Sequence, residues 1–129
     1  MDYLADTITI IRYFSKTGEI GNKAKSILDA TDKGGNHIFV SVISLVEIMY
    51  LAEKRRIKVN LHETVESINH SINYSIVELS SQIVMIAEAT FFPELHDRLI
   101  IATAKYLKIP ILTGDKKILK TDAVSTIWK

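Results

Sequence analysis

Short apolar runs rich in β-branched residues recur along the chain, and longer stretches with apolar residues three and four positions apart separate them. The short runs are typical of buried strands, and the longer stretches predict helices. The run at residues 74–80 is a further candidate strand. The predicted strands cover residues 2–5, 37–43, 109–112 and 124–128.

The predicted helices lie between these strands, and turn signals mark several of their ends. The sequence Asp-Lys-Gly-Gly-Asn at residues 32–36 is the clearest turn in the chain. The helices are expected at residues 7–14, 19–31, 44–58, 61–72, 81–91 and 93–107, with one short helical turn at 115–119.

The order of these elements predicts an α/β fold. Strands that alternate with helices imply a central parallel sheet with helices on both faces. The 129 residues suit a single core, and no repeat, low-complexity tract or linker interrupts them. We therefore expect one domain over residues 1–129.

Composition narrows the chemistry without naming a partner. The formal net charge of +1 neither demands nor excludes a nucleic acid, since a local patch can exist within a balanced total. The absence of cysteine removes disulfides and thiolate catalysis. Asp2 and Asp6 interrupt the N-terminal apolar run, so we expect it not to be a signal peptide. No run approaches the ~20 apolar residues of a membrane span. We expect a cytoplasmic protein with no membrane segment.

Four acidic residues occupy equivalent positions relative to the predicted sheet. Asp6 ends the first strand, and Glu47 lies in the first turn of the helix after residues 37–43. Asp97 lies near the start of the helix at residues 93–107, and Asp115 follows the next strand, at residues 109–112. All four are expected at one rim, where open α/β sheets hold their ligands.

Carboxylates gathered at one rim repel each other, and each raises the pKa of the others unless a cation compensates. The oxygen ligands and the lack of thiols favour Mg²⁺, with Mn²⁺ as a plausible substitute. A divalent ion in such a site can orient water and stabilise charge on a phosphodiester. The pattern therefore predicts hydrolysis of a nucleic-acid backbone.

Three segments of the chain resemble the PIN-domain family, in particular the VapC-type toxins of toxin–antitoxin pairs. They are "YLADT", "SVISLVEIMYL" and "HDRLIIATAKYLKIPILTGDKKI". The resemblance implies a magnesium-dependent endoribonuclease that acts on RNA, forms a homodimer and is inhibited by a cognate antitoxin. It places the catalytic and metal-binding carboxylates on Asp6, Glu47, Asp97 and Asp115, with further hydroxyls on Thr113 and Thr7.

One position departs from the family pattern. Family members commonly carry a polar residue directly after the Asp-Thr pair, where this chain has Ile8. A hydrogen bond near the metal is then absent, or is supplied by Thr9 or water. The substitution bears on the rate of catalysis more than on the fold.

Each acid also has a purely structural interpretation. Asp6 suits a helix N-cap, and Ser44 with Glu47 matches the S-x-x-E capping box. Asp97 complements a helix dipole, and Asp115 suits a turn after glycine. The joint position of all four at one rim favours the metal site over four separate structural roles.

Nearby basic residues have two interpretations each. Arg98 either pairs with a carboxylate of the site or is solvated. The basic run at residues 53–58, with Lys54 two turns beyond Glu47, either contacts RNA phosphates or stabilises a helix C-terminus. Lys116 and Lys117 have the same two interpretations, and His96 is expected to have a surface or packing role.

Two alternatives to a nuclease stay open. The first is a catalytically silent PIN-like module that only binds RNA or protein. The apolar Ile8, at a position that is commonly polar in the family, favours this alternative. The second is a phosphoacceptor signalling domain of receiver type, which also places acids at this rim. Such domains need an adjacent acid pair after the first strand, and this chain offers only Asp6 there.

Overall fold

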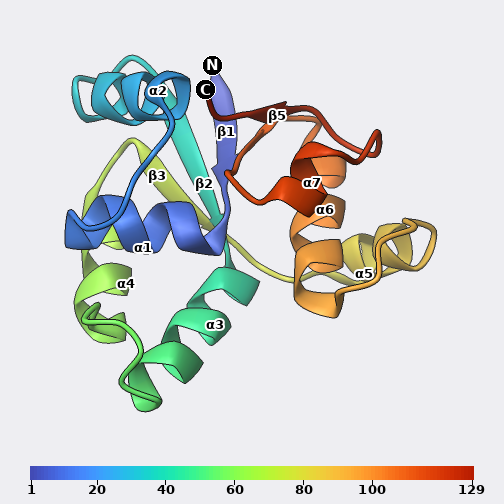
Figure 1. The fold of residues 1–129 in the computed structure, drawn as a ribbon, viewed down its shortest axis with the longest axis horizontal. Helices are drawn as coiled ribbons and strands as arrows, with labels where there is room; N and C mark the ends of the chain where they lie inside the picture. Colours follow the sequence, from blue (N-terminus) through green and yellow to red (C-terminus); the bar gives the residue numbers. More distant parts are fainter.

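The computed structural model describes residues 1–129 and contains one five-stranded sheet (Figure 1). Every pair of neighbouring strands is parallel, and the strand order is β3-β2-β1-β4-β5. This arrangement confirms the predicted α/β fold with a parallel sheet. The strands are β1 (Asp2–Ala5), β2 (His37–Ser41), β3 (Tyr74–Val77), β4 (Ile111–Leu112) and β5 (Thr126–Ile127).

Seven helices accompany the sheet, and none of them combines the length and the apolar character needed to cross a membrane. The helices are α1 (Thr7–Ser15), α2 (Asn22–Asp32), α3 (Val42–Glu53), α4 (Leu61–His70), α5 (Ser81–Glu88), α6 (Leu95–Leu107) and α7 (Lys116–Leu119).

The two faces of the sheet carry separate apolar clusters. Side chains alternate along a strand, so Tyr3 and Ala5 belong to one cluster while Leu4 between them belongs to the other. Helices α1, α2 and α4 contribute to the first cluster, α6 and α7 contribute to the second, and α3 contributes to both through Ile48 and Ile43. Figure 1 shows α1, α2 and α4 on one side of the sheet and α5, α6 and α7 on the other. Both faces are therefore covered, as a parallel sheet requires.

The strand order creates a switch point beside β1. The chain moves from β1 to β2 and β3 on one side, then returns past β1 to place β4 on its other side. The connections after β1 and β4 therefore leave in different directions and open a crevice at the carboxyl ends of these two strands. Crevices of this kind hold the ligands of open α/β sheets.

Three helix starts differ from the sequence-based expectation. Helix α3 begins at Val42 because the Ser41 hydroxyl accepts the Ile43 N–H at 3.0 Å, so Glu47 lies in the second turn rather than the first. Helix α6 begins after Glu94, whose carboxylate accepts the Asp97 N–H, and not at Pro93. Helix α2 begins at Asn22, three residues later than expected.

The second cluster predicts a strong dependence of stability on Ile101, which is fully buried in α6. Ile101→Ala should lower the free energy of unfolding by about 2–5 kcal/mol, because it removes buried methyl groups and leaves a cavity. Ile72→Ala makes the same chemical change at a side chain that is 90% exposed, and should cost less than ~0.5 kcal/mol. Urea unfolding of both variants tests this, and equal losses would contradict the assigned core.

Candidate active site

A cleft of about 250 Å³ opens at the switch point between β1 and β4. All four predicted acids line it, and they come from four separate parts of the chain. Asp6 follows β1, Glu47 lies in α3, Asp97 lies in the first turn of α6, and Asp115 precedes α7. The fold thus brings together residues that are distant in sequence.

Asp6 is the most buried of the four acids, and two other groups hold its carboxylate in place. One oxygen accepts the Thr9 N–H at 2.9 Å and so caps α1, while the other accepts a hydrogen bond from the Thr113 hydroxyl. Burial raises the pKa of Asp6, and the hydrogen bonds from Thr113 and Thr9 oppose that rise. The capping role expected for Asp6 is therefore present, and it leaves the residue at the cleft.

Thr113 connects two acids of the cleft. Its fully buried hydroxyl donates to Asp6 and accepts the Asp115 N–H at 3.0 Å. Asp115 is exposed, and its Oδ1 accepts the N–H groups of Lys117 at 2.8 Å and Ile118 at 3.0 Å. Asp115 therefore caps α7 rather than serving only as a turn residue. Thr113 thus holds Asp6 and the turn at Asp115 together, and its part in catalysis stays a prediction.

Glu47 is held by Thr7, the residue after Asp6. The Thr7 hydroxyl donates to Glu47 Oε1 at 2.6 Å and lies 2.9 Å from the hydroxyl oxygen of Ser44. The proposed capping box of Ser44 and Glu47 is wrong, because Ser41 caps α3 and Ser44 is buried inside the helix. Glu47 is thus directed toward the start of α1 and not toward its own helix end.

Asp97 experiences the combined charge of the site most strongly. Burial, followed by the negative charges of Glu94, Asp115, Glu47 and Asp6 in that order, raises its pKa to about 7. Glu94 caps α6 by accepting the Asp97 N–H at 2.6 Å, which explains why it is the first of these charges. The carboxylates are therefore close enough to disfavour each other's ionised forms.

The side chains as they stand do not form a metal-binding cluster. No group of three or more histidine, cysteine or acidic side chains is arranged to hold a single ion. The acids are instead occupied locally: Asp6 by Thr113 and Thr9, Glu47 by Thr7, and Asp115 by the start of α7. The four acids nevertheless offer only oxygen ligands, which hard cations prefer, and the pKa of Asp97 is raised, as expected for a partly buried acid beside other acids. The metal site stays a prediction.

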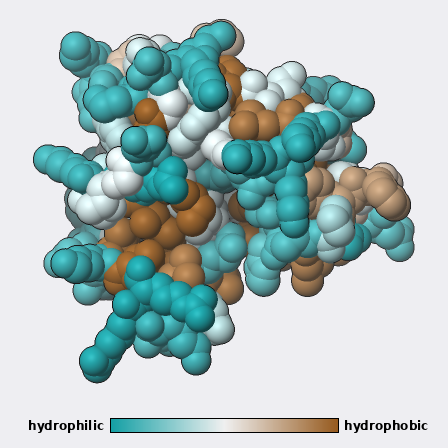
Figure 2. Space-filling view, viewed as in Figure 1, coloured by the Kyte–Doolittle hydropathy of each residue, from teal (hydrophilic) through white to brown (hydrophobic).

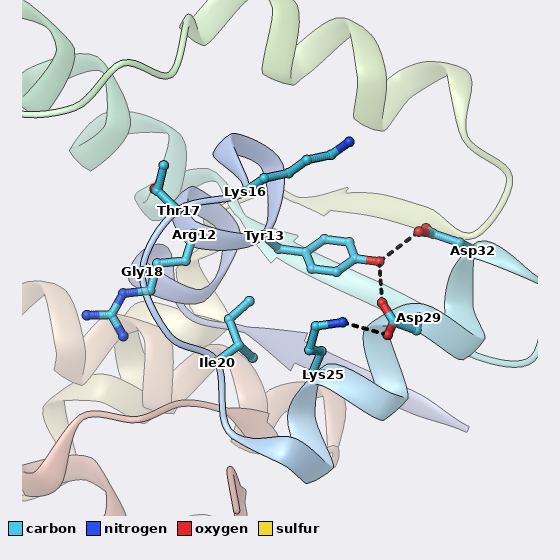
Figure 3. A pocket seen from close by; sticks show the side chains of 9 residues that line it. All are labelled: Arg12, Tyr13, Lys16, Thr17, Gly18, Ile20, Lys25, Asp29 and Asp32. Carbon is cyan, nitrogen blue, oxygen red and sulfur yellow. Dashed lines mark hydrogen bonds and ion pairs between the residues drawn. The ribbon is translucent and has the colours of Figure 1, made fainter.

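Among the cleft residues missed in the sequence are one cation, Arg12, and one aromatic residue, Trp128. Arg12 lies one helical turn after Ile8, and both line the cleft, so the four-residue spacing was an available signal. Arg12 also borders a neighbouring cavity of about 400 Å³, and its Nη1 donates to the Glu19 carbonyl at 2.8 Å. Figure 3 shows Arg12 pointing away from Tyr13, whose hydroxyl contacts Asp29 and Asp32. Trp128 had no comparable signal, because its position depends on the final strand.

None of the basic residues expected near the site forms an ion pair with its acids. Arg98 forms no ion pair with a carboxylate, and its buried Nε has no hydrogen-bond partner. Lys54 lies 5.6 Å from the ring centroid of Tyr50. His96 is exposed beside Glu94, as expected for a surface role. Contact between the exposed lysines and RNA stays a prediction.

The family model for the PIN domain matches residues 3–124, so the chain belongs to the PIN-domain family. This confirms the resemblance noted in the sequence. Comparison with curated protein sequences gives no match.

Solved structures with the same fold come from toxin–antitoxin complexes. VapBC2 from Rickettsia felis, bound to a DNA fragment from its promoter, matches at TM-score 0.73 and 17% identity, with 100% of both chains covered. DNA-bound VapBC from Salmonella typhimurium matches at TM-score 0.68 and 14% sequence identity, and the match covers 98% of this chain and 97% of that chain. A toxin–antitoxin complex from Klebsiella pneumoniae matches at TM-score 0.65 and 21% sequence identity. That match covers 97% of this chain and 95% of the other chain.

The burial of Asp97, together with the negative charges around it, predicts a specific pH dependence in metal-free buffer. The pKa of Asp97 lies near 7 in the folded protein and near 3.8 when unfolded, so the folded form binds more protons between these values. Its contribution to stability is therefore lost as the pH rises from 4 to 7. Asp97→Asn should be more stable than the native protein at pH 8, by on the order of 1 kcal/mol after allowance for solvent screening, and equal to it near pH 4.

Urea unfolding of both proteins at several pH values in chelator measures this difference. Asp122→Asn, at an exposed acid outside the cleft, is the control and should show no pH-dependent gain. A gain for Asp97→Asn that stays the same from pH 4 to pH 8 would contradict the crowding of these carboxylates.

Proposed function

We propose that the protein is a VapC-type toxin, a magnesium-dependent endoribonuclease that hydrolyses RNA phosphodiester bonds. The observation that carries the proposal is the convergence of Asp6, Glu47, Asp97 and Asp115 on one cleft of a PIN-domain protein. Structural roles alone do not account for keeping Asp97 at this position, because a half-buried acid beside four other carboxylates is unfavourable for stability unless a cation compensates.

The chain's own residues would hold and orient the reacting groups. The four carboxylates would hold Mg²⁺ (or Mn²⁺), which when bound supplies positive charge to the phosphodiester and to an attacking water. Thr113 fixes the Asp6 carboxylate, and Thr7 fixes Glu47, so neither acid depends on solvent for its orientation. Arg12 lines the same cleft, and its guanidinium, which donates to the Glu19 carbonyl, would place a permanent cation near a bound phosphate.

A protein partner is part of the same proposal. The structures that share this fold come from complexes of toxins with antitoxins, and this chain would bind a cognate antitoxin and form a homodimer. Exposed apolar side chains support such contacts: Val46, Met49 and Tyr50 on α3, and Val84 and Met85 on α5. Figure 2 shows apolar surface in the region of α1, α3 and α4, surrounded by polar side chains. Large exposed apolar areas of this kind typically mark interaction surfaces.

One observation favours a second candidate, a silent PIN-like module that binds RNA or protein without cleaving it. Ile8 is 47% exposed and lines the cleft directly, where family resemblance implies a polar residue. An apolar side chain there removes one potential hydrogen bond to a metal-bound water. The receiver-type alternative has no such observation, and the match to the PIN-domain model argues against it.

RNA cleavage tests the main proposal. The purified protein should cleave total RNA in Mg²⁺ or Mn²⁺ and not in chelator. Asp97→Asn should lower the rate at least about 100-fold, because even residues that only support metal ligands typically contribute 10–100-fold. Asp122→Asn is the matched control and should cleave at the native rate, and circular dichroism should show both variants folded.

Either of two results would contradict the assignment of the protein as a metal-dependent nuclease with Asp97 in its active site. The first is cleavage that continues unchanged in chelator. The second is cleavage by Asp97→Asn at the native rate. Retained RNA binding without any cleavage by the native protein would instead support the silent module.

A further inference from the structure

Trp128 occupies a fixed place in the wall of the acidic cleft. It follows β5, and its indole lies against Gly114, the residue between Thr113 and Asp115. A Cβ atom on Gly114 would lie 2.5 Å from indole Cε2, so only glycine permits this approach. The aromatic ring is therefore packed directly on the segment that carries two residues of the site.

The backbone of Trp128 is anchored as firmly as its ring. Its carbonyl accepts the Ala24 N–H at 3.1 Å, and a Cβ on Gly21 would lie 2.1 Å from that carbonyl oxygen. The start of α2 and the turn after β4 thus hold the residue from two sides. A side chain held this way loses little conformational entropy when a ligand binds it.

Trp128 nonetheless remains accessible from the cleft. The residue is only partly buried, and its indole N–H donates to no protein acceptor yet is not among the buried atoms that lack a partner. Trp128 packs partly against the first apolar cluster, so part of its side chain belongs to the core, and the indole N–H is free to pair with a ligand. The apolar residues that line the cleft are Ile8, Leu51, Ile100 and Trp128, and we call these four its apolar wall.

We propose that Trp128 is a binding residue that stacks against a nucleobase of the RNA, next to the phosphate held by the acids. The inference rests on the proposed function and adds the part of the substrate that the apolar wall recognises. Single-stranded RNA is commonly bound by stacking its bases on aromatic side chains, which every base can do. The two parts of the cleft suit the two parts of a nucleotide. The acids would bind the phosphate through a cation, and the ring of Trp128 would stack on the base.

The fluorescence of Trp128 reports on this contact directly, because it is the only tryptophan in the chain. A short single-stranded RNA is titrated into the Asp97→Asn protein in Mg²⁺, which prevents cleavage during the measurement. We expect saturable quenching of the tryptophan emission. Inorganic polyphosphate at the same phosphate concentration provides charge without bases and should not quench. Equal quenching by both polymers, or none by RNA, would overturn the proposal.

Kinetics of RNA cleavage separate stacking from a purely structural role. Trp128→Leu keeps an apolar side chain but loses the ring, and should raise KM about tenfold with kcat little changed. Trp128→Phe should restore most of the binding. Tyr106→Leu removes an exposed aromatic ring outside the cleft, and is the control that should leave KM unchanged. A lower melting temperature for Trp128→Leu with native KM would show that the ring only fills space.

The failures of the two proposals are distinguishable. If the native protein cleaves RNA but the RNA neither quenches Trp128 nor binds less tightly to Trp128→Leu, the stacking inference fails and the nuclease stands. If RNA quenches Trp128 but is never cleaved, the nuclease proposal fails while the stacking site is supported.

Discussion

The hydrogen bond from Thr113 to Asp6 connects the two strand ends on which the cleft depends. Asp6 directly follows β1 and Thr113 directly follows β4, and these neighbouring strands send the chain in different directions. The bond satisfies a buried carboxylate that would otherwise be strongly unfavourable, since an unpaired buried charge costs several kcal/mol. The same hydroxyl accepts the Asp115 N–H, and the same carboxylate caps α1. One small network thus fixes the relative positions of β1, β4, α1 and the turn before α7.

The second constraint is repulsion, and it works against the fold. Burial is the largest cause of the raised pKa of Asp97, and the negative charges of Glu94, Asp115, Glu47 and Asp6 raise it further. A sequence selected only for stability would place an amide or an apolar residue at such a position. Functional sites are where proteins tolerate unfavourable local electrostatics, because the ligand provides the missing charge. The hydroxyls of Thr7 and Thr113 lessen the problem at Glu47 and Asp6, and nothing comparable contacts the Asp97 carboxylate.

The fold was predictable from sequence because its strands are β-branched runs and its acids follow strand ends. Parallel strands place those ends at one edge, so the gathering of the acids around one cleft followed from topology. Which serine caps α3 was not predictable: Ser41 and Ser44 are both suitable, and the buried contact of Ser44 with Thr7 decides between them. Trp128 reaches the cleft only through its packing on Gly21 and Gly114, which involves residues far apart in sequence. The burial of Arg98 Nε without a hydrogen-bond partner was not predictable either, because it depends on how distant parts of the chain pack around this side chain.

The central claim is that acids from four parts of the chain share one hard divalent cation. Anomalous diffraction from crystals soaked in Mn²⁺ tests it most directly, because the ion is located by its own signal. We predict a peak bordered by carboxylate oxygens of Asp6 and Asp97, with those of Glu47 and Asp115 directed toward it. A well-diffracting crystal with no manganese peak in the cleft, or with a peak only at surface acids elsewhere, would contradict the account.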